Sequence, residues 1–200
     1  MASIYDLKPK FQGLLRPLTN ALARGGVTAN QVTLAAMLLS LAVGAAVALR
    51  PSAGVLLLVP LTLFLRMAFN AIDGMLAREH GQKSRLGAVL NELGDVVSDA
   101  GLYLPFARVL AGEAALVVGI VLVAVIGEMT GVVGIQVGAS RRYDGPMGKS
   151  DRAFWFGLLA LLLGLGVAAG AWVRWYLAVV LLLGVVTILN RARGALREGA

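Results

Sequence analysis

The sequence predicts an all-α integral membrane protein with six transmembrane helices and an N-terminal interfacial amphipathic helix. Hydrophobic residues make up 58% of the 200 residues and charged residues 14%, whereas a soluble domain has roughly 25% charged residues. A span needs about 20 mostly apolar residues. Six segments meet or approach this length: 30–49, 53–78, 87–109, 113–139, 152–171 and 173–190.

The N-terminal segment, residues 1–26, has apolar side chains at helical spacing with basic residues between them. The apolar positions are Ile4, Leu7, Phe11, Leu14, Leu15, Leu18 and Leu22, and the basic ones are Lys8, Lys10 and Arg16. This pattern is typical of a helix that lies in the membrane interface; an ordinary solvated helix is the alternative. The segment lacks the continuous apolar core of a cleavable signal. Residues 27–200 are predicted to form a single six-helix membrane domain.

Lys and Arg residues indicate the orientation. With a cytoplasmic N-terminus, Arg50, Arg108 and Arg174 fall on the far side, Arg66 lies within the membrane, and the other basic residues are cytoplasmic. The positive-inside rule then places both termini in the cytoplasm, in an inner (cytoplasmic) membrane. Lipid headgroups and phosphorylated substrates account for the net charge of +7, so membrane lipids and no nucleic acid are the expected partners. The absence of cysteine excludes disulfides.

The second and third spans carry polar side chains on defined helical faces. Asn70, Asp73 and Gly74 share one face at spacings i, i+3 and i+4, and Asn91 and Asp95 share another at i, i+4. Ionisable groups at membrane depth are costly and therefore indicate function.

An antiparallel hairpin about a loop near residues 79–86 would bring these two faces together. Asn70 would then lie level with Asp95, and Arg66 level with Asp99. We therefore expect oxygen ligands from two helices to converge, and Arg66 to form an ion pair with Asp99.

The fourth span carries a stripe of small residues that lets another helix approach closely. Its members are Gly127, Gly131, Gly134 and Gly138. Packing within the chain and contact in a homodimer are both compatible with the stripe, and a homodimer is the favoured expectation. Glu128 beside it has no obvious partner in the sequence.

The loop between the fourth and fifth spans is strongly basic. It contains Arg141, Arg142, Lys149 and Arg152. One interpretation is topology-setting charge, with Asp151 capping the next helix. The other is an anion pocket for the phosphate of an acceptor, because Arg offers a fork matched to phosphate and Lys a point charge.

Residues 70–95 resemble the signature of the CDP-alcohol phosphotransferase family, D-x-x-D-G-x-x-A-R, about eight residues, then G-x-x-x-D-x-x-x-D. The matching positions are Asn70, Asp73, Gly74, Ala77, Arg78, Gly87, Asn91 and Asp95. Two of the four motif carboxylates are amides here, at Asn70 and Asn91. At the start of the first span, Asn30 and Thr33, but not Ala29, match a Pro-Asn-x-x-Thr stretch found near the nucleotide site of related enzymes. Capping of the helix by Thr28 or Asn30 is the favoured interpretation of this segment.

The resemblance implies a role for each matching residue. Asn70, Asp73, Asn91 and Asp95 would hold Mg²⁺ or Mn²⁺, and Asp95 would also be the catalytic base. The donor nucleotide would lie against Asn30, Asp73, Gly74, Ala77, Arg78 and Gly87. The basic loop resembles relatives that accept phosphorylated alcohols, so Arg141, Arg142, Lys149 and Arg152 would bind the acceptor phosphate.

The function implied is that of a phospholipid-synthesis transferase. It would move the phosphatidyl group of CDP-diacylglycerol to a small, phosphorylated alcohol and release CMP, with the site facing the cytoplasm. Two alternatives stay open. The amides at Asn70 and Asn91 suit a catalytically degenerate relative that binds CDP-lipid or assists a partner enzyme, and acids within spans suit a small transporter.

Overall fold

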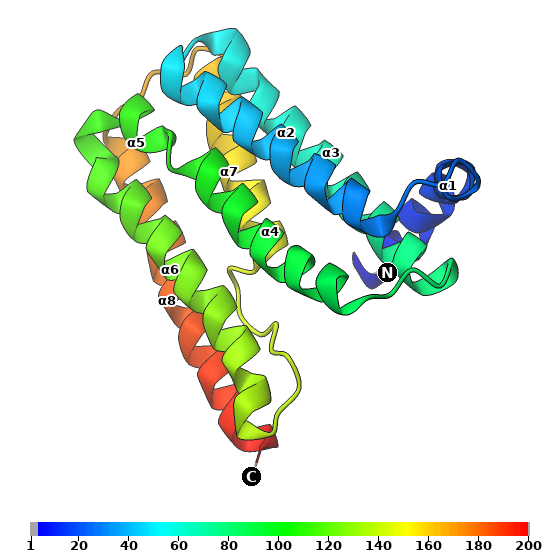
Figure 1. Ribbon diagram of the computed structural model, residues 1–200. Coiled ribbons are helices and arrows are strands. Elements are labelled where there is room, and N and C mark those ends of the chain that lie inside the picture. The colour runs from blue at the N-terminus through cyan, green and yellow to red at the C-terminus, as the bar shows by residue number, and fades with distance from the viewer. Residues whose placement is uncertain (1–3, 200) are drawn as a thin grey trace. The chain divides into compact units, whose positions relative to one another are not determined.

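The computed structural model describes residues 4–199, and every regular element in this range is a helix (Figure 1). Residues 1–3 and 200 lie outside the described residues, as do the side chains of residues 4–9, on which part of the predicted amphipathic pattern depends. The elements are α1 Ile4–Arg24, α2 Ala29–Leu49, α3 Ala53–Glu79, α4 Arg85–Tyr103, α5 Phe106–Val109, η1 Ala111–Glu113, α6 Ala114–Val133, η2 Gly134–Val137, α7 Lys149–Gly164 and α8 Ala171–Glu198.

The chain forms two compact units. Unit 1 consists of Met1–Leu41 with Thr62–Ser98, and unit 2 of Ala42–Leu61 with Asp99–Ala200. Unit 1 therefore contains α1, the first half of α2, the second half of α3 and most of α4. Unit 2 contains the end of α2, the start of α3, the end of α4 and all elements from α5 onward.

Helices lie at all six predicted spans. Four helical stretches are long and apolar enough to cross a bilayer: Ala29–Leu49, Ala53–Glu79, Ala111–Val137 and Ala171–Glu198. The other two are α4, whose 19 residues carry the polar motif, and α7, whose 16 residues span only about 24 Å. The hydrocarbon core is about 30 Å thick, so membrane crossing by α4 and α7 stays a prediction.

The four candidate spans expose large apolar side chains. One example from each is Leu38, 60% exposed, Leu61, 53%, Leu122, 57%, and Leu182, 63%. Apolar surface of this extent would be unfavourable in water and suits contact with lipid chains.

Helix α1 packs on the rest of unit 1 through one face. Leu15, Leu22 and Ala23 lie against its buried cluster, and the ring of Phe11 meets that of Phe64 edge-on at 6.3 Å. Leu14 on the other side is 80% exposed. The predicted N-terminal helix is present, and its location in the membrane interface stays a prediction.

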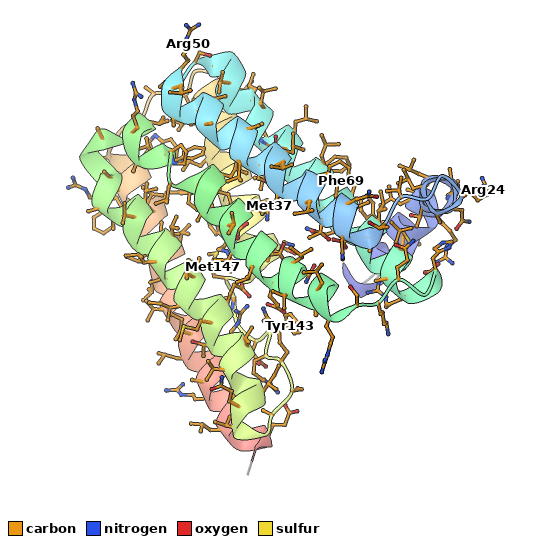
Figure 2. The ribbon with its side chains drawn as sticks, in the orientation of Figure 1. Arg24, Met37, Arg50, Phe69, Tyr143 and Met147 are labelled. Atoms are coloured by element: carbon orange, nitrogen blue, oxygen red, sulfur yellow. The ribbon has the colours of Figure 1, made fainter. Side chains whose placement is uncertain are left out.

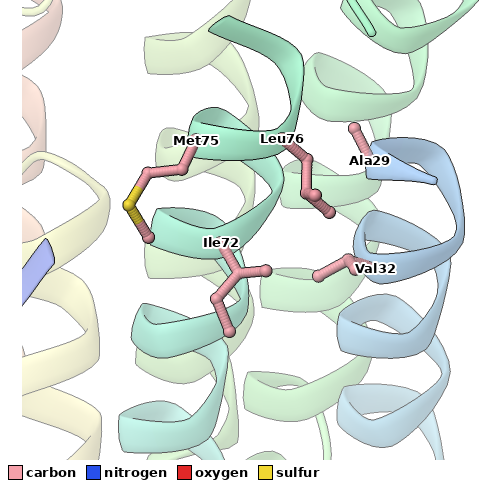
Figure 3. Close-up of a cluster of buried hydrophobic side chains, with 5 residues drawn as sticks. All are labelled: Ala29, Val32, Ile72, Met75 and Leu76. Carbon is pink, nitrogen blue, oxygen red and sulfur yellow. The ribbon is translucent and has the colours of Figure 1, made fainter. Parts of the chain in front are cut away.

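The buried cluster of unit 1 joins the start of α2 to the end of α3 (Figure 3). It consists of Ala29, Val32, Ile72, Met75 and Leu76. Phe69 and Ala77 of α3 pack against it. Because Asp73 and Gly74 lie between these apolar positions, the packing fixes the face on which α3 presents the motif.

Unit 2 is built on α6 and α8, which lie side by side along most of their length (Figure 1). Gly184 permits this approach, because a Cβ there would come within 2.7 Å of Val123 Cγ1. The rings of Tyr103 and Phe156 stack at 4.0 Å, and Phe106 meets Phe156 edge-on, which adds aromatic packing between α4, α5 and α7.

Candidate active site

The predicted metal and donor residues all lie in unit 1. Helix α3 carries Asn70, Asp73, Gly74, Ala77 and Arg78, helix α4 carries Gly87, Asn91 and Asp95, and helix α2 carries Asn30. The predicted acceptor residues Arg141, Arg142, Lys149 and Arg152 all lie in unit 2.

The start of α2 is held by reciprocal capping bonds. The backbone N–H of Thr28 donates to Gln31 Oε1 at 2.9 Å, and the N–H of Gln31 donates to Thr28 Oγ1 at 3.3 Å. This is a capping box, which satisfies two otherwise unpaired donors of the first turn. Of the two predicted caps, Thr28 fills this role, and Asn30 is left for another contact.

Gln82, in the loop between α3 and α4, ties that loop to the start of α2. Its Oε1 accepts the backbone N–H of Ala29 at 2.7 Å, and its Nε2 donates to the carbonyl of Val27 at 3.3 Å. The motif loop and the first span therefore form one local structure. Sequence reasoning missed Gln82, because nothing in its neighbourhood signals a partner more than fifty residues away.

Thr33 links the first span to the motif. Its hydroxyl donates to Asp73 Oδ2 at 2.8 Å and also lies 3.1 Å from the carbonyl of Ala29. Asp73 is only 6% exposed, so this bond orients a buried carboxylate. Thr33 was noted only as part of a resembling stretch, and its contact makes it a member of the site.

Gly74 leaves room for the side chain of Arg78 one turn later on α3. A Cβ at Gly74 would lie 3.0 Å from both terminal nitrogens of Arg78. The guanidinium therefore lies against the bare backbone of Gly74, which explains why a glycine and an arginine occur at this spacing in the motif.

Gly87 in the first turn of α4 leaves room for Asn30. A Cβ at Gly87 would lie 2.8 Å from Asn30 Oδ1 and 3.0 Å from Ser84 Oγ. At Gly94 of α4, an added Cβ would lie 3.6 Å from the methyl of Thr33, so α2 and α4 also lie close together there. Asn30 and Thr33 therefore both lie where the start of α2 comes close to the motif helices α3 and α4.

The four predicted metal ligands differ in exposure. Asp73 is buried, Asn70 and Asp95 are half-buried, and Asn91 is exposed. Within the described part of the chain, no group of three His, Cys, Asp or Glu residues is placed to hold a metal. The donor set is instead two carboxylates and two amides, and the oxygens of both suit a hard divalent cation. The chemistry of the donors fits Mg²⁺ or Mn²⁺, with two formal negative charges.

Arginine side chains in unit 2 surround the carboxylate of Glu128. Arg141 reaches Glu128 Oε2 at 2.8 Å, Arg152 reaches Oε1 at 2.9 Å, and Arg191 reaches Oε2 at 3.2 Å. Arg152 also pairs with Asp99 at 2.9 Å. Glu128, which had no obvious partner in the sequence, has three, and Arg191 was missed because it lies far along the chain on α8.

Asp99 therefore has a partner that the hairpin register did not suggest. Its Oδ2 accepts from Nε of Arg152 at 2.9 Å, and Asp99 and Arg152 are both buried. The predicted pairing of Asp99 with Arg66 joins residues of different units and stays a prediction.

Arg142 forms a second, more exposed group with acidic residues. It donates to Asp144 Oδ2 at 2.7 Å and also pairs with Glu198. The bond from Arg142 lowers the pKa of the Asp144 carboxyl below its usual range. An open pocket of about 590 Å³ adjoins this group and is lined by Arg142, Asp144, Asn190, Arg193, Gly194, Arg197 and Glu198.

The basic loop is held along α8. The backbone N–H of Met147 donates to Thr187 Oγ1 at 2.9 Å, and Gly145 approaches Thr187 so closely that a Cβ would meet its Cα at 2.7 Å. Figure 2 shows Tyr143 and Met147 on this connection. Asp151 accepts from the N–H of Gly148 at 2.9 Å. It therefore supports the start of α7 as the third residue of the helix, whereas the N-cap itself is Gly148.

The glycine stripe of α6 packs within the chain. A Cβ at Gly131 would lie 2.6 Å from the carbonyl of Arg142, and one at Gly134 would lie 3.1 Å from Arg142 Cγ. Gly127 faces Ile188 of α8. These contacts assign the stripe to intrachain packing, and the homodimer stays a prediction.

An all-helical fold with several apolar spans is that of a multi-pass membrane protein. The profile of the CDP-alcohol phosphatidyltransferase family matches residues 26–189, and the chain belongs to this family of transferases. It is 45% identical over 200 residues to the inner membrane protein YnbA of Escherichia coli (strain K12), covering 99% of this chain and 98% of the relative.

Two solved structures share the fold. Both are of phosphatidylinositol phosphate synthase (PgsA1) from Mycobacterium tuberculosis. The one in complex with manganese and citrate has a TM-score of 0.76 at 20% identity, over 90% of this chain and 88% of the other. The one with CDP-DAG bound has a TM-score of 0.71 at 22% identity, over 90% and 92%.

Proposed function

We propose that this chain transfers the phosphatidyl group of CDP-diacylglycerol to a small alcohol and releases CMP. Family membership supports the reaction class, and the CDP-DAG bound to a protein of the same fold supports the donor. The observation that carries the proposal is the bond from Thr33 to Asp73, because it orients a motif carboxylate beside the helix start that carries Asn30. A donor made of nucleotide and lipid also suits a site within apolar helices.

The nucleotide part of the donor would lie where the start of α2, the end of α3 and the start of α4 come together. Gly74 and Ala77 present little side chain, and Arg78 offers a guanidinium to the pyrophosphate. Asn30 and Gly87 border the same region. These residues would bind and orient the donor, which is the larger part of catalysis when a phosphoryl group is transferred.

The transfer itself needs a base for the acceptor hydroxyl. In our proposal Asp95 takes this proton while the hydroxyl oxygen forms a bond to the phosphatidyl phosphorus and the bond to CMP breaks. Asp95 is half-buried on α4. It is the only ionisable residue among the motif positions of α4, since position 91 is Asn.

A divalent cation, Mg²⁺ or Mn²⁺, would be held by Asn70, Asp73, Asn91 and Asp95. When bound, it would neutralise charge on the pyrophosphate. Manganese in a protein of the same fold supports this choice. The two amides supply neutral oxygens, so we expect weaker metal binding than four carboxylates would give.

We further propose the inner membrane as the location, with the site facing the cytoplasm and the chain working as a homodimer. The name of the Escherichia coli relative supports the location. The charge bias of the loops supports the orientation. The sequence predicts that Arg141, Arg142, Lys149 and Arg152 bind the phosphate of the acceptor. Because Arg141 and Arg152 pair with Glu128, we leave out the phosphate and propose only a small alcohol.

Release of CMP from CDP-diacylglycerol tests the reaction. The purified chain in detergent or lipid should release CMP when Mg²⁺ or Mn²⁺ and a suitable alcohol are present, and a chelator should stop the release. Asn70 and Asn91 favour one other candidate, a relative that binds CDP-lipid without turnover. Binding of CDP-diacylglycerol without CMP release, for every alcohol and both metals, would select that alternative.

A further inference from the structure

The carboxylate of Glu128 occupies the centre of an arginine cluster in unit 2. We propose that Glu128 is a specificity-determining residue that fills this anion position itself, so that the acceptor of this chain is an alcohol without a phosphate. The inference about the acceptor rests on the proposed function. The observation behind it is that Arg141, Arg152 and Arg191 all direct guanidinium nitrogens to the same carboxylate, within 2.8 to 3.2 Å.

The donors of these arginines are already in use. Besides Glu128, Arg152 donates to Asp99 and to the carbonyl of Met147. Arg191 donates to the carbonyl of Gly127 at 2.6 Å. A phosphate is recognised through several such donors at once. To bind here, a phosphate would have to displace carboxylate and carbonyl oxygens that belong to the same folded chain.

Two of these arginines also donate hydrogen bonds to the backbone of the basic loop. Arg141 donates to the carbonyl of Arg142 at 2.6 Å, and Arg191 donates through Nε to the carbonyl of Asp144 at 3.3 Å. These bonds hold the backbone of the basic loop. The arginines therefore act as supports of the loop as well as partners of Glu128.

The charges of the buried arginine cluster are largely balanced by acids of the same unit. Arg141, Arg152 and Arg191 face Glu128 and Asp99, which leaves one net positive charge; Arg142, with Asp144 and Glu198, forms the separate and more exposed group. A phosphate monoester carries about two negative charges at neutral pH. With Glu128 in place, it would therefore leave an excess of negative charge in a buried setting, where such an excess is costly.

The internal cavity that adjoins Arg152 is too small for a phosphate, and the open pocket of about 590 Å³ is lined by Arg142 but not by Glu128, Arg141, Arg152 or Arg191. Arg152, Gly127, Met147 and Thr187 help to line an internal cavity of about 10 Å³, which is near the lower limit for a single water molecule, about 10–15 Å³. An anion could enter only if a side chain such as that of Glu128 left its position.

Binding of inorganic phosphate tests the role of Glu128 without any need for turnover. Glu128→Gln keeps the shape of the side chain and removes its charge. We expect the variant to gain saturable phosphate binding, seen as a rise in Tm with phosphate concentration, whereas the unaltered chain shows no such binding at the cluster. The matched control is Glu113→Gln, which removes the partner of one exposed arginine, Arg174, and should gain no site.

A second variant keeps the test decisive if Glu128→Gln does not fold. Arg193→Gln with Arg197→Gln removes two cations of the open pocket and leaves Glu128 in place. Saturable phosphate binding by this double variant overturns the proposal, because the anion would then bind with Glu128 still present. Absence of binding supports it. A folded Glu128→Gln variant that binds phosphate no better than the unaltered chain also overturns it.

The choice of acceptor provides the functional readout. Glycerol and glycerol 3-phosphate are a matched pair that differ only in the phosphate. We expect the unaltered chain to prefer the neutral member, and Glu128→Gln to shift the ratio of kcat/KM toward the phosphorylated one by about tenfold or more, as for one gained hydrogen bond to a charged group. A preference of the unaltered chain for the phosphorylated member overturns the proposal.

The outcomes separate this inference from the proposed function. If no alcohol yields CMP while Glu128→Gln gains phosphate binding, the proposed transferase reaction fails and the anion-filling role of Glu128 holds. If CMP is released but Glu128→Gln gains no phosphate site, the reaction holds and the role of Glu128 fails.

Discussion

The hydroxyl of Thr33 on α2 donates a 2.8 Å hydrogen bond to Oδ2 of Asp73 on α3, a link between two residues that lie forty positions apart in the sequence. Asp73 is buried among apolar neighbours, where a carboxylate needs such a donor to keep one orientation. The relationship places Thr33 beside the family motif, although it lies far from the motif in sequence.

Removal of this hydroxyl is therefore the first prediction. Thr33→Val keeps the shape of the side chain, and we expect CMP release to fall roughly 10- to 100-fold, as for loss of a hydrogen bond to a charged group. The measurement is kcat/KM for CDP-diacylglycerol, with Tm as a check on folding. Thr33→Ser should retain most activity. The matched control is Thr130→Val, whose hydroxyl donates to the Ile126 carbonyl of its own helix; an equal loss in both variants would remove Thr33 from the site.

The two motif carboxylates should differ in what their loss does. Asp95→Asn removes a proposed metal ligand and the proposed base, so we expect turnover to disappear while the chain stays folded. Asp73→Asn should chiefly weaken binding of the metal and the donor nucleotide. CMP release measured against metal concentration separates the two effects, and Glu113→Gln, in the exposed pair with Arg174, is the control. Substantial turnover by Asp95→Asn would exclude it as the base.

Restoring the family pattern should tighten metal binding. Asn70→Asp with Asn91→Asp adds two negative charges to the donor set, which increases attraction to a dication. We expect a lower Kd for Mn²⁺ by calorimetry, in line with the added charges. Turnover need not rise, because a shifted metal can misplace the donor phosphate. If the unaltered chain is inert and this variant releases CMP, the native protein is a catalytically degenerate relative.

Two motif glycines should respond differently to an added methyl group. At Gly74 the added Cβ meets the flexible end of Arg78, so Gly74→Ala should leave the free energy of unfolding within about 1 kcal/mol of its value but weaken donor binding. At Gly87 it meets Asn30 and Ser84 near the helix start, at 2.8 and 3.0 Å, and we expect destabilisation by about 1–3 kcal/mol. Chemical denaturation checks both.

Gly54 is the control for these substitutions. It lies on α3, the helix that carries Gly74, and an added Cβ there meets nothing within 4 Å. Gly54→Ala should therefore be neutral or stabilising, by up to about 1 kcal/mol. A loss of donor binding in Gly54→Ala as large as in Gly74→Ala would mean that the effect is not specific to the Arg78 contact.

Membrane topology provides the last prediction. We expect six crossings, with both termini and the loops at residues 79–86 and 139–148 in the cytoplasm, because the basic residues gather in these segments and at the helix ends that flank them. Reporter fusions or cysteine accessibility in intact cells would check it. Accessibility of residues 80–84 from outside would contradict the orientation, and residues 104–110 on the cytoplasmic side would show that α4 does not cross.

Local features of the protein followed from the sequence alone. Helices formed at all six apolar segments, because an apolar run depends only on neighbouring residues. Some of the predicted limits were wrong: α7 ends at Gly164 and not at residue 171, and α8 continues past residue 190 to Glu198. The spacing of the motif placed Asp73 and Gly74 on one face, and Asp151 supports the start of α7, although from the third position of the helix and not as its N-cap. Such features depend on contacts within a few residues, which periodicity and capping preferences describe well.

Partners distant in sequence were decided only by the tertiary structure. The sequence left two interpretations of the basic loop, topology-setting charge and an anion pocket. The fold pairs Arg141 and Arg152 of this region with Glu128 and adds Arg191 from α8. Gln82 and Thr33 found their roles in the same way. A charge or a hydroxyl in a sequence does not say which group it will meet, because that depends on how helices pack, and a buried polar group takes whichever partner the packing brings within hydrogen-bond distance.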